Sequence, residues 1–418
     1  MSFFPCSCIA KSKVGIGACD DPVHQSSSTA LASDISFECV SMVTMIEYLP
    51  VPHHYQLLAV IGKGSEDVAA TIYLAKHLPS NAHLAIRTCN LDCLTDELAI
   101  LQHEFQLLRV LKHDNISAFH CAFVHYNELW VVMPLMAYGS AKDIISLEDH
   151  FGYGLSELAI AFILRDVVTA LDYIHRMGYV HRSVRAGHIL LSGDGRSYLS
   201  GLRSAISMVE DGKKLKAVHD FPRNAIKALP WLAPEVLEQN VLGYDSSSDI
   251  YSVGITACEL ANGCVPFSDM TPTKMLLEKF NGTTPRLLDS TTACLVEEPV
   301  FKTESDATDS GLGSSVAASS VYKNNDPNSP FNRTFSQTFH DFVEVCLKSD
   351  PNQRPCAATL LSHPFFKQIK KRPNENLVQL LHPVAPLTDA SNLPRVKDKS
   401  LEDADEMAKL SLKDPWEF

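Results

Sequence analysis

The sequence has no run of about eighteen apolar residues, so no transmembrane helix is predicted. Its N-terminus, "MSFFPCSCIAKSK", lacks the apolar core of a signal peptide. The twelve cysteines include no C-x-x-C pair, a pattern that favours reduced thiols of an intracellular protein over zinc ligands or a disulfide framework. Cys6 and Cys8 are candidate lipidation sites, although the favoured interpretation is two incidental cysteines in a loose terminus.

Positive charge is also in short supply. Lys and Arg number 36 against 49 Asp and Glu, and the net charge of −13 argues against general binding to nucleic acid or to anionic membranes. Of the 418 residues, 45% are apolar and 20% are charged, so most of the chain should fold.

The chain is not uniform along its length, and it contains no repeats. Residues 1–54 predict a disordered leader, residues 289–336 a disordered Ser/Thr-rich insertion, and residues 370–418 an extended tail. Short apolar runs from Tyr55 onward predict strands at "YQLLAVIG", "ATIYLAKH", "HLAIRTCN" and "LWVVMPL". Apolar residues at helical spacing predict helices over Thr95–Leu111, Leu155–Met177, Thr338–Lys348 and Ala357–Lys371.

A series of short motifs follows in a fixed order. It comprises "VIGKGSEDVAATIYLAKH", "LAIR", Glu104 ahead of "HDNI", "HRSVRAGH", "GLR", "APE", "DIYSVG" and "DPNQRP". Each motif is weak alone, but in this order they make the chain resemble the protein kinase fold from Tyr55 to Ile369. The resemblance implies a bilobal α+β architecture, with a β-rich N-lobe over residues 55–136 and a larger helical C-lobe over residues 137–369.

The resemblance assigns structural roles to three retained residues. Glu235 and Arg354 should form the buried ion pair that ties the activation segment to the helical lobe, and Asp249 should anchor the backbone of the catalytic loop. Breaking one side of such a pair costs about 3–5 kcal/mol. The alternative is that these residues are ordinary surface charges.

The positions that carry catalysis in this fold have been replaced. Ser183 stands where an aspartate accepts the substrate proton, and a neutral alcohol is no base near neutral pH. His188 replaces a magnesium-binding asparagine, and imidazole suits a hard cation poorly. Gly201 replaces the aspartate that bridges metal and phosphate. Because kinase catalysis is mostly positioning and metal electrostatics, we expect neither a catalytic residue nor a bound metal.

Two further departures agree with this interpretation. Ala228 stands where such folds usually carry a threonine, and no Ser, Thr or Tyr lies between Ser207 and Glu235. An activation segment without hydroxyl groups cannot be ordered by phosphorylation. The sequence therefore predicts a pseudokinase, and the rival interpretation is a weakly active kinase with rearranged catalytic residues.

The cleft keeps part of a nucleotide site. Gly62 and Gly64 remain in the glycine loop, Asp67 replaces its third glycine, and Arg87 replaces the lysine that pairs with Glu104. The predicted apolar walls are Ile61, Val68, Ala85 and Leu190, with Met133 as gatekeeper and Met136 at the hinge. We expect ATP to bind as a stabilising ligand without magnesium, with Arg185 and Arg203 supplying positive charge. The alternative is that these arginines pair with acids of the protein.

The combination of "AYGSAKD", "YVHRSVRAGHIL", "YLSGLRS", "SDIYSVGITACELANG" and a terminal "WEF" resembles the sterile-twenty-related adaptor (STRAD) pseudokinases, without separating the alpha from the beta form. The resemblance implies cytoplasmic and nuclear localisation, and a heterotrimer with liver kinase B-one and the helical-repeat MO-twenty-five scaffold. In that assembly the pseudokinase would activate its partner kinase as a pseudosubstrate and favour its cytoplasmic retention. Trp416, Glu417 and Phe418 would dock on the scaffold; an unstructured end with incidental aromatics is the alternative.

Overall fold

The computed structural model describes residues 47–64, 70–93, 98–147, 153–222, 225–239, 241–292 and 332–389. Asp67, Val68 and the tail residues Trp416, Glu417 and Phe418 lie outside these ranges, as do most of the predicted leader and insertion. The fold below is that of the described residues.

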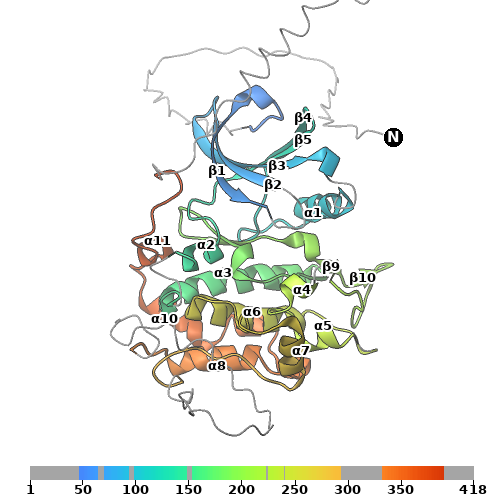
Figure 1. Cartoon of the computed structure of the whole chain (residues 1–418), viewed down its shortest axis with the longest axis vertical. Helices are drawn as coiled ribbons and strands as arrows, with labels where there is room; N and C mark the ends of the chain where they lie inside the picture. Colours follow the sequence, from blue (N-terminus) through green and yellow to red (C-terminus); the bar gives the residue numbers. More distant parts are fainter. Residues whose placement is uncertain are drawn as a thin grey trace, which may run out of the picture. The chain divides into compact units, whose positions relative to one another are not determined.

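The first part of the fold is a five-stranded antiparallel sheet (Figure 1) with strand order β1-β2-β3-β5-β4. Its strands are β1 (Tyr55–Lys63), β2 (Ala70–His77), β3 (Ala82–Asn90), β4 (Cys121–His125) and β5 (Glu128–Pro134). The central strand β3 is buried at six consecutive residues, as expected for a strand that is covered on both faces. Ile86 and Val132 are fully buried and pair with each other across β3 and β5.

One long helix accompanies the sheet. Helix α1 (Leu98–Val110) buries Leu101, Glu104 and Leu107, which follow one another at intervals of three residues and therefore share one face. Leu101 packs with Cys89 of β3, so this face is turned toward the sheet. The predicted helix Thr95–Leu111 is confirmed over its described part.

The rest of the fold is mainly helical and holds the largest buried core. Helix α3 (Glu157–Arg176) begins at Ser156, whose Oγ accepts a hydrogen bond from the amide of Ala159. Helix α6 (Ser247–Asn262) is buried on almost every side, which fits its apolar sequence. The other helices are α2 (Ala141–Ile145), α4 (Ala225–Ala228), α5 (Pro234–Glu238), α7 (Pro272–Phe280), α8 (Gln337–Cys346), α9 (Ala357–Leu360), α10 (Lys367–Lys371) and α11 (Leu377–Leu380).

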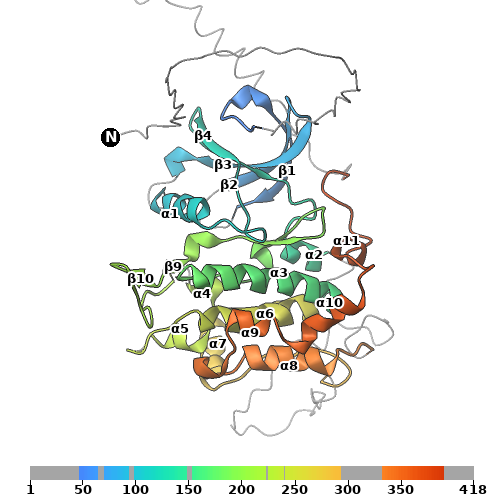
Figure 2. The ribbon, with the colours of Figure 1, turned by 180° about the vertical axis from the view of Figure 1, so that it is seen from behind.

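Short strand pairs lie around the catalytic loop and in the segment that follows it, and the first of them links the two regions. They are β6 (Tyr179–Val180) with β9 (Ile206–Ser207), β7 (Ile189–Leu191) with β8 (Ser197–Leu199), and β10 (Val209–Glu210) with β11 (Lys213–Lys214). The 3-10 turns are η1 (Pro52–His54), η2 (Leu91–Cys93), η3 (Ala186–His188), η4 (Leu202–Ser204), η6 (Pro351–Gln353) and η7 (Pro364–Phe366). Strand β10 lies at the margin of the helical part, as both views show (Figures 1 and 2). The predicted α+β class, a sheet followed by a helical region, is confirmed.

Two predicted elements need correction. The helix predicted over Ala357–Lys371 is divided into α9, η7 and α10. Pro364 explains the break, because it lacks an amide hydrogen and disfavours helical backbone at His363. The tail from residue 370 is not extended throughout, since α11 lies within it and buries Leu377.

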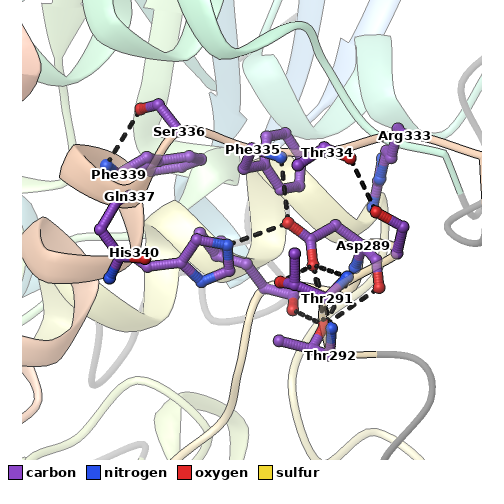
Figure 3. A network of polar contacts seen from close by, with 12 residues as sticks. Asp289, Thr291, Thr292, Arg333, Thr334, Phe335, Ser336, Gln337, Phe339 and His340 are labelled. Atoms are coloured by element: carbon purple, nitrogen blue, oxygen red, sulfur yellow. Dashed lines mark hydrogen bonds and ion pairs between the residues drawn. The ribbon is translucent and has the colours of Figure 1, made fainter.

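The flanks of the predicted insertion are also ordered, and they meet at one carboxylate (Figure 3). One oxygen of Asp289 accepts hydrogen bonds from the amide of Thr291 at 2.9 Å and from its hydroxyl at 2.6 Å. The other accepts from the amide of Phe335 at 3.0 Å and from Nε2 of His340 at 2.9 Å. Burial alone would raise the pKa of Asp289, but these hydrogen bonds hold it well below its ordinary value. We call this arrangement the Asp289 clasp.

Among the described residues, none of the helices combines the length and the apolar character that a bilayer-spanning helix needs.

Candidate functional site

Two acidic residues of α6 accept hydrogen bonds from the backbone of the catalytic loop. Asp249 is fully buried and accepts hydrogen bonds from the amides of His181 and Arg182, both at 2.8 Å. Burial alone would raise the pKa of Asp249, but these contacts and a hydrogen bond from His175 hold it below its ordinary value. Glu259, which the sequence did not single out, accepts from the amide of Ala186 at 3.0 Å. The loop therefore has a rigid support although its catalytic side chains are gone.

Two of the replaced catalytic residues, Ser183 and His188, are linked by hydrogen bonds. Nδ1 of His188 lies 2.8 Å from the carbonyl oxygen of Ser183 and 2.9 Å from its hydroxyl oxygen. Nε2 of His188 lies 3.1 Å from a guanidinium nitrogen of Arg185. Because a guanidinium can only donate, Nε2 must accept, and the ring proton resides on Nδ1. Burial, and then the charge of Arg185, lower the pKa of His188 well below its ordinary value, so the imidazole is neutral.

The third replaced position is closed by the same imidazole ring. Gly201 has a left-handed backbone with φ of 88°, which favours glycine. A Cβ atom on Gly201 would lie 2.5 Å from Nδ1 of His188 and 2.8 Å from its Cγ, distances that real contacts do not reach. His188 thus fills the space that any side chain at position 201 would need. The glycine and the histidine are steric complements.

These contacts show that the residues do not fit a magnesium ion. Of the three positions, Gly201 has no side-chain ligand, Nδ1 of His188 carries a proton and its Nε2 is taken by Arg185. Magnesium requires several oxygen ligands in octahedral geometry, and no carboxylate stands at positions 183, 188 or 201. Nor does the described part of the chain gather three His, Cys, Asp or Glu side chains in a way that would hold a metal.

The link between the sheet and α1 is present. Arg87 of β3 donates to both carboxylate oxygens of Glu104, at 3.4 and 3.2 Å, and both residues are buried. Burial alone would raise the pKa of Glu104, but Arg87 and then Arg203 hold it below its ordinary value. The pair therefore keeps its charges, and α1 is held close to the sheet.

The other two arginines of the predicted cleft interact with groups of the protein. The guanidinium of Arg185 bonds His188 and lies 5.6 Å from the ring centre of Trp231. Arg203 lies near enough to Glu104 and His188 to affect the pKa of each. Arg185 thus contacts a histidine and a tryptophan, and Arg203 lies near an acid; both pairing with acids of the protein and a role toward phosphate stay predictions.

The predicted adenine walls come from both parts of the fold. Ala85 of β3 is buried and pairs with Met133 of β5, so the two face one another across adjacent strands. Met136 follows β5 and is buried, and Leu190 of β7 contributes from the helical part. The remaining described members of the predicted set are Ile61 and Gly62 of β1 and Gly64 just after it.

The structural ion pair is fully formed. Arg354 donates to both oxygens of Glu235, at 2.6 and 2.9 Å, and both side chains are buried. Arg354 also donates to the carbonyl of Lys348 at 2.7 Å. The helix that follows the activation segment is therefore fixed to the helical core. Ala228, at the end of α4, has only a methyl group and cannot donate to Ser183.

Sequence reasoning missed a buried lysine beside this pair. The ammonium of Lys279 donates to the carbonyls of Pro230 and Leu232 at 2.8 and 2.7 Å. It lies 4.8 Å from the ring centre of Tyr251 and 5.8 Å from that of Phe267. Burial lowers the pKa of Lys279 to about 7. Nothing in the local sequence of α7 marks this lysine, because its partners lie far away along the chain.

Comparison with known proteins shows which family the sequence matches. A family model described as "Protein kinase domain" matches residues 55–366. A relative named "STE20-related kinase adapter protein alpha" from Gallus gallus is 54% identical over 348 residues, which cover 82% of this chain and 88% of the relative. The Homo sapiens alpha protein is 51% identical over 88% of this chain and 84% of its own length. The Homo sapiens beta protein is 42% identical over 79% of each chain.

Proposed function

Because this chain belongs to the STE20-related kinase adapter family, we propose that it binds and allosterically activates a serine/threonine kinase, liver kinase B-one. The chain is a pseudokinase, and it would act within a heterotrimer that includes the MO-twenty-five scaffold. It would engage its partner as a pseudosubstrate, favour the partner's active conformation and retain it in the cytoplasm.

One observation carries the proposal. The side chain of His188 occupies the space at the replaced catalytic positions, while the structural contacts of the surrounding kinase fold are intact. His188 occupies the space of the missing side chain at Gly201 and bonds Ser183. By contrast, the Glu235–Arg354 pair and the Asp249 anchor retain short, buried hydrogen bonds. A fold that keeps its shape and closes its reaction centre is suited to binding another protein.

The cleft would take ATP as a stabilising ligand without magnesium. Arg87 keeps a positive charge at the base of the cleft, and its Nε is buried without a hydrogen-bond partner among the described residues. ATP would add contacts on both sides of the cleft, and a ligand that favours the same conformation as the partner raises the partner's affinity. The tail residues Trp416, Glu417 and Phe418 would dock on the scaffold, where aromatic anchors commonly contribute much of the binding energy.

Reconstitution tests the proposal. The purified chain, liver kinase B-one and the scaffold are mixed in all combinations, and phosphorylation of a peptide substrate of liver kinase B-one is measured. We expect the full combination to raise that activity well above liver kinase B-one alone, and labelled ATP to show no phosphate transfer by this chain. Unchanged partner activity would refute the activator function, and transfer by this chain alone would favour a weakly active kinase.

A further inference from the structure

The catalytic-loop arginine makes an ion pair with the activation segment. Arg182 has a left-handed backbone with φ of 63°. Its Nη1 lies 2.6 Å from a carboxylate oxygen of Asp220, and the side chain of Arg182 is only 10% exposed. Asp220 lies between β11 and α4, in the segment from Gly201 to Glu235 that has no hydroxyl side chain after Ser207.

Several hydrogen bonds converge on the same two residues. Nε of Arg182 donates to the carbonyl of Ser204 at 2.5 Å, and Nη1 also contacts the hydroxyl of Tyr244 at 3.1 Å. The Tyr244 hydroxyl donates to the backbone carbonyl of Asp220 at 2.5 Å. Val218 and Tyr244 exchange backbone hydrogen bonds at 2.8 and 3.0 Å. One guanidinium therefore joins the catalytic loop, the start of the activation segment, its middle, and the chain that leads into α6.

In active kinases, a phosphorylated residue of the activation segment commonly orders that segment by pairing with arginine. In this chain the arginine is kept as Arg182, and it forms an ion pair with the carboxylate of Asp220. A carboxylate has about one negative charge where a phosphate has nearly two. The backbone carbonyl of Asp220 also accepts hydrogen bonds from the Tyr244 hydroxyl at 2.5 Å and from Nη1 of Arg182 at 3.3 Å, so the carboxylate is not the only tie between the two segments.

We propose that Asp220 permanently replaces the activation-segment phosphate. Its charge on Arg182 holds the segment around Val218–Phe221 in the ordered conformation that a regulated kinase reaches only after phosphorylation. The segment is then ordered at all times and is independent of any activating kinase or phosphatase. The biological role of this ordered segment rests on the proposed function, because the segment would form part of the surface presented to the partner kinase.

Hydrogen exchange of the full chain tests the assignment without any partner. Asp220→Ala and the nearly isosteric Asp220→Asn should increase exchange of amides in residues 215–222 about five- to tenfold, as loss of a charge-assisted hydrogen bond predicts. Asp220→Glu should restore most of the protection. Glu210→Ala is the matched control, because Glu210 is an exposed acid of the same segment, and it should exchange like the wild type.

Salt supplies a readout that a purely steric role would not affect. Asp220 is 59% exposed, so raising the salt concentration from about 50 to about 500 mM should increase wild-type exchange in this segment. Asp220→Asn should show little salt dependence. Equal exchange in wild type, Asp220→Asn and Asp220→Ala, or wild-type exchange that ignores salt, would overturn the assignment.

The partner assay separates the two proposals. If Asp220 orders the segment and the activator function is right, Asp220→Asn should weaken activation of the partner kinase and Glu210→Ala should not. If the exchange results hold but even the wild-type chain fails to activate the partner, the proposed function is refuted and the assignment of Asp220 stands.

Discussion

Substitution of Gly201 by alanine should destabilise the protein through His188, and the size of the effect can be worked out. A non-glycine residue in the left-handed region costs about 1–2 kcal/mol, and Gly201 has φ of 88°. The added methyl would also lie 2.5 Å from Nδ1 of His188. Forcing an extra carbon into a packed site costs about 1–3 kcal/mol. The imidazole cannot retreat freely, since Ser183 and Arg185 bond it from two sides. The expected loss for Gly201→Ala is therefore about 2–5 kcal/mol.

A double-mutant cycle isolates the steric part. His188→Ala removes the ring, so in that background Gly201→Ala should cost only the backbone term of about 1–2 kcal/mol. Unfolding in urea and thermal unfolding would be measured for the wild type, both single variants and the double variant. The coupling between the two sites should be about 1–3 kcal/mol and favourable to the double variant.

Two outcomes would refute this reasoning. One is a Gly201→Ala variant as stable as the wild type, and the other is additivity of the two substitutions within about 0.5 kcal/mol. The same geometry predicts that Gly201→Asp is tolerated better with His188→Asn than alone. Even with Ser183→Asp added, phosphate transfer should recover little, because Ala228 and Arg87 still depart from the kinase pattern.

Five further predictions concern other parts of the molecule. The folded pKa of Lys279 is about 7 and its unfolded value about 10.4, so the unfolded state binds more protons between these values. Wild-type stability should therefore rise with pH in that window by up to about 1.4 kcal/mol per unit; Lys279→Met should lack this slope in urea unfolding, and equal slopes would disprove it. Asp289→Ala should cost about 2–4 kcal/mol by leaving buried amides unpaired. Replacing residues 293–331 by a short Gly-Ser linker should leave the melting temperature unchanged, and a large fall would show that the clasp alone does not close this region. ATP with EDTA should raise the melting temperature, by linkage worth roughly 2.7 kcal/mol at 100 times the dissociation constant, whereas a shift only with magnesium would contradict binding without metal. Truncation of Trp416–Phe418 should weaken scaffold binding by about 2 kcal/mol or more without changing the ATP shift, and unchanged binding would reject the tail assignment.

The sequence by itself determined the fold class and the loss of catalytic residues. Strands β2 and β5 follow apolar runs that are visible in the sequence, and α3 begins at a serine that caps it, as local rules predict. Ser183, His188 and Gly201 were found because kinase motifs occur in a fixed order. Such signals are local, since each depends on residues within a few positions of one another.

Only the tertiary structure decided how the altered positions interact. His188 can fill the space at Gly201 because the glycine has a left-handed backbone and no side chain. Asp220 and Arg182, which form an ion pair, are 38 positions apart in the sequence. Lys279 is also far along the chain from Pro230, whose carbonyl it bonds, and Asp289 is far from Phe335 on the other side of its clasp. No periodicity or motif encodes these pairs, because the packing of separate elements around α6 brings them together. Lys279 and Asp289 gain their partners from that packing, whereas the Glu235–Arg354 pair could be predicted because each of its residues belongs to a kinase motif.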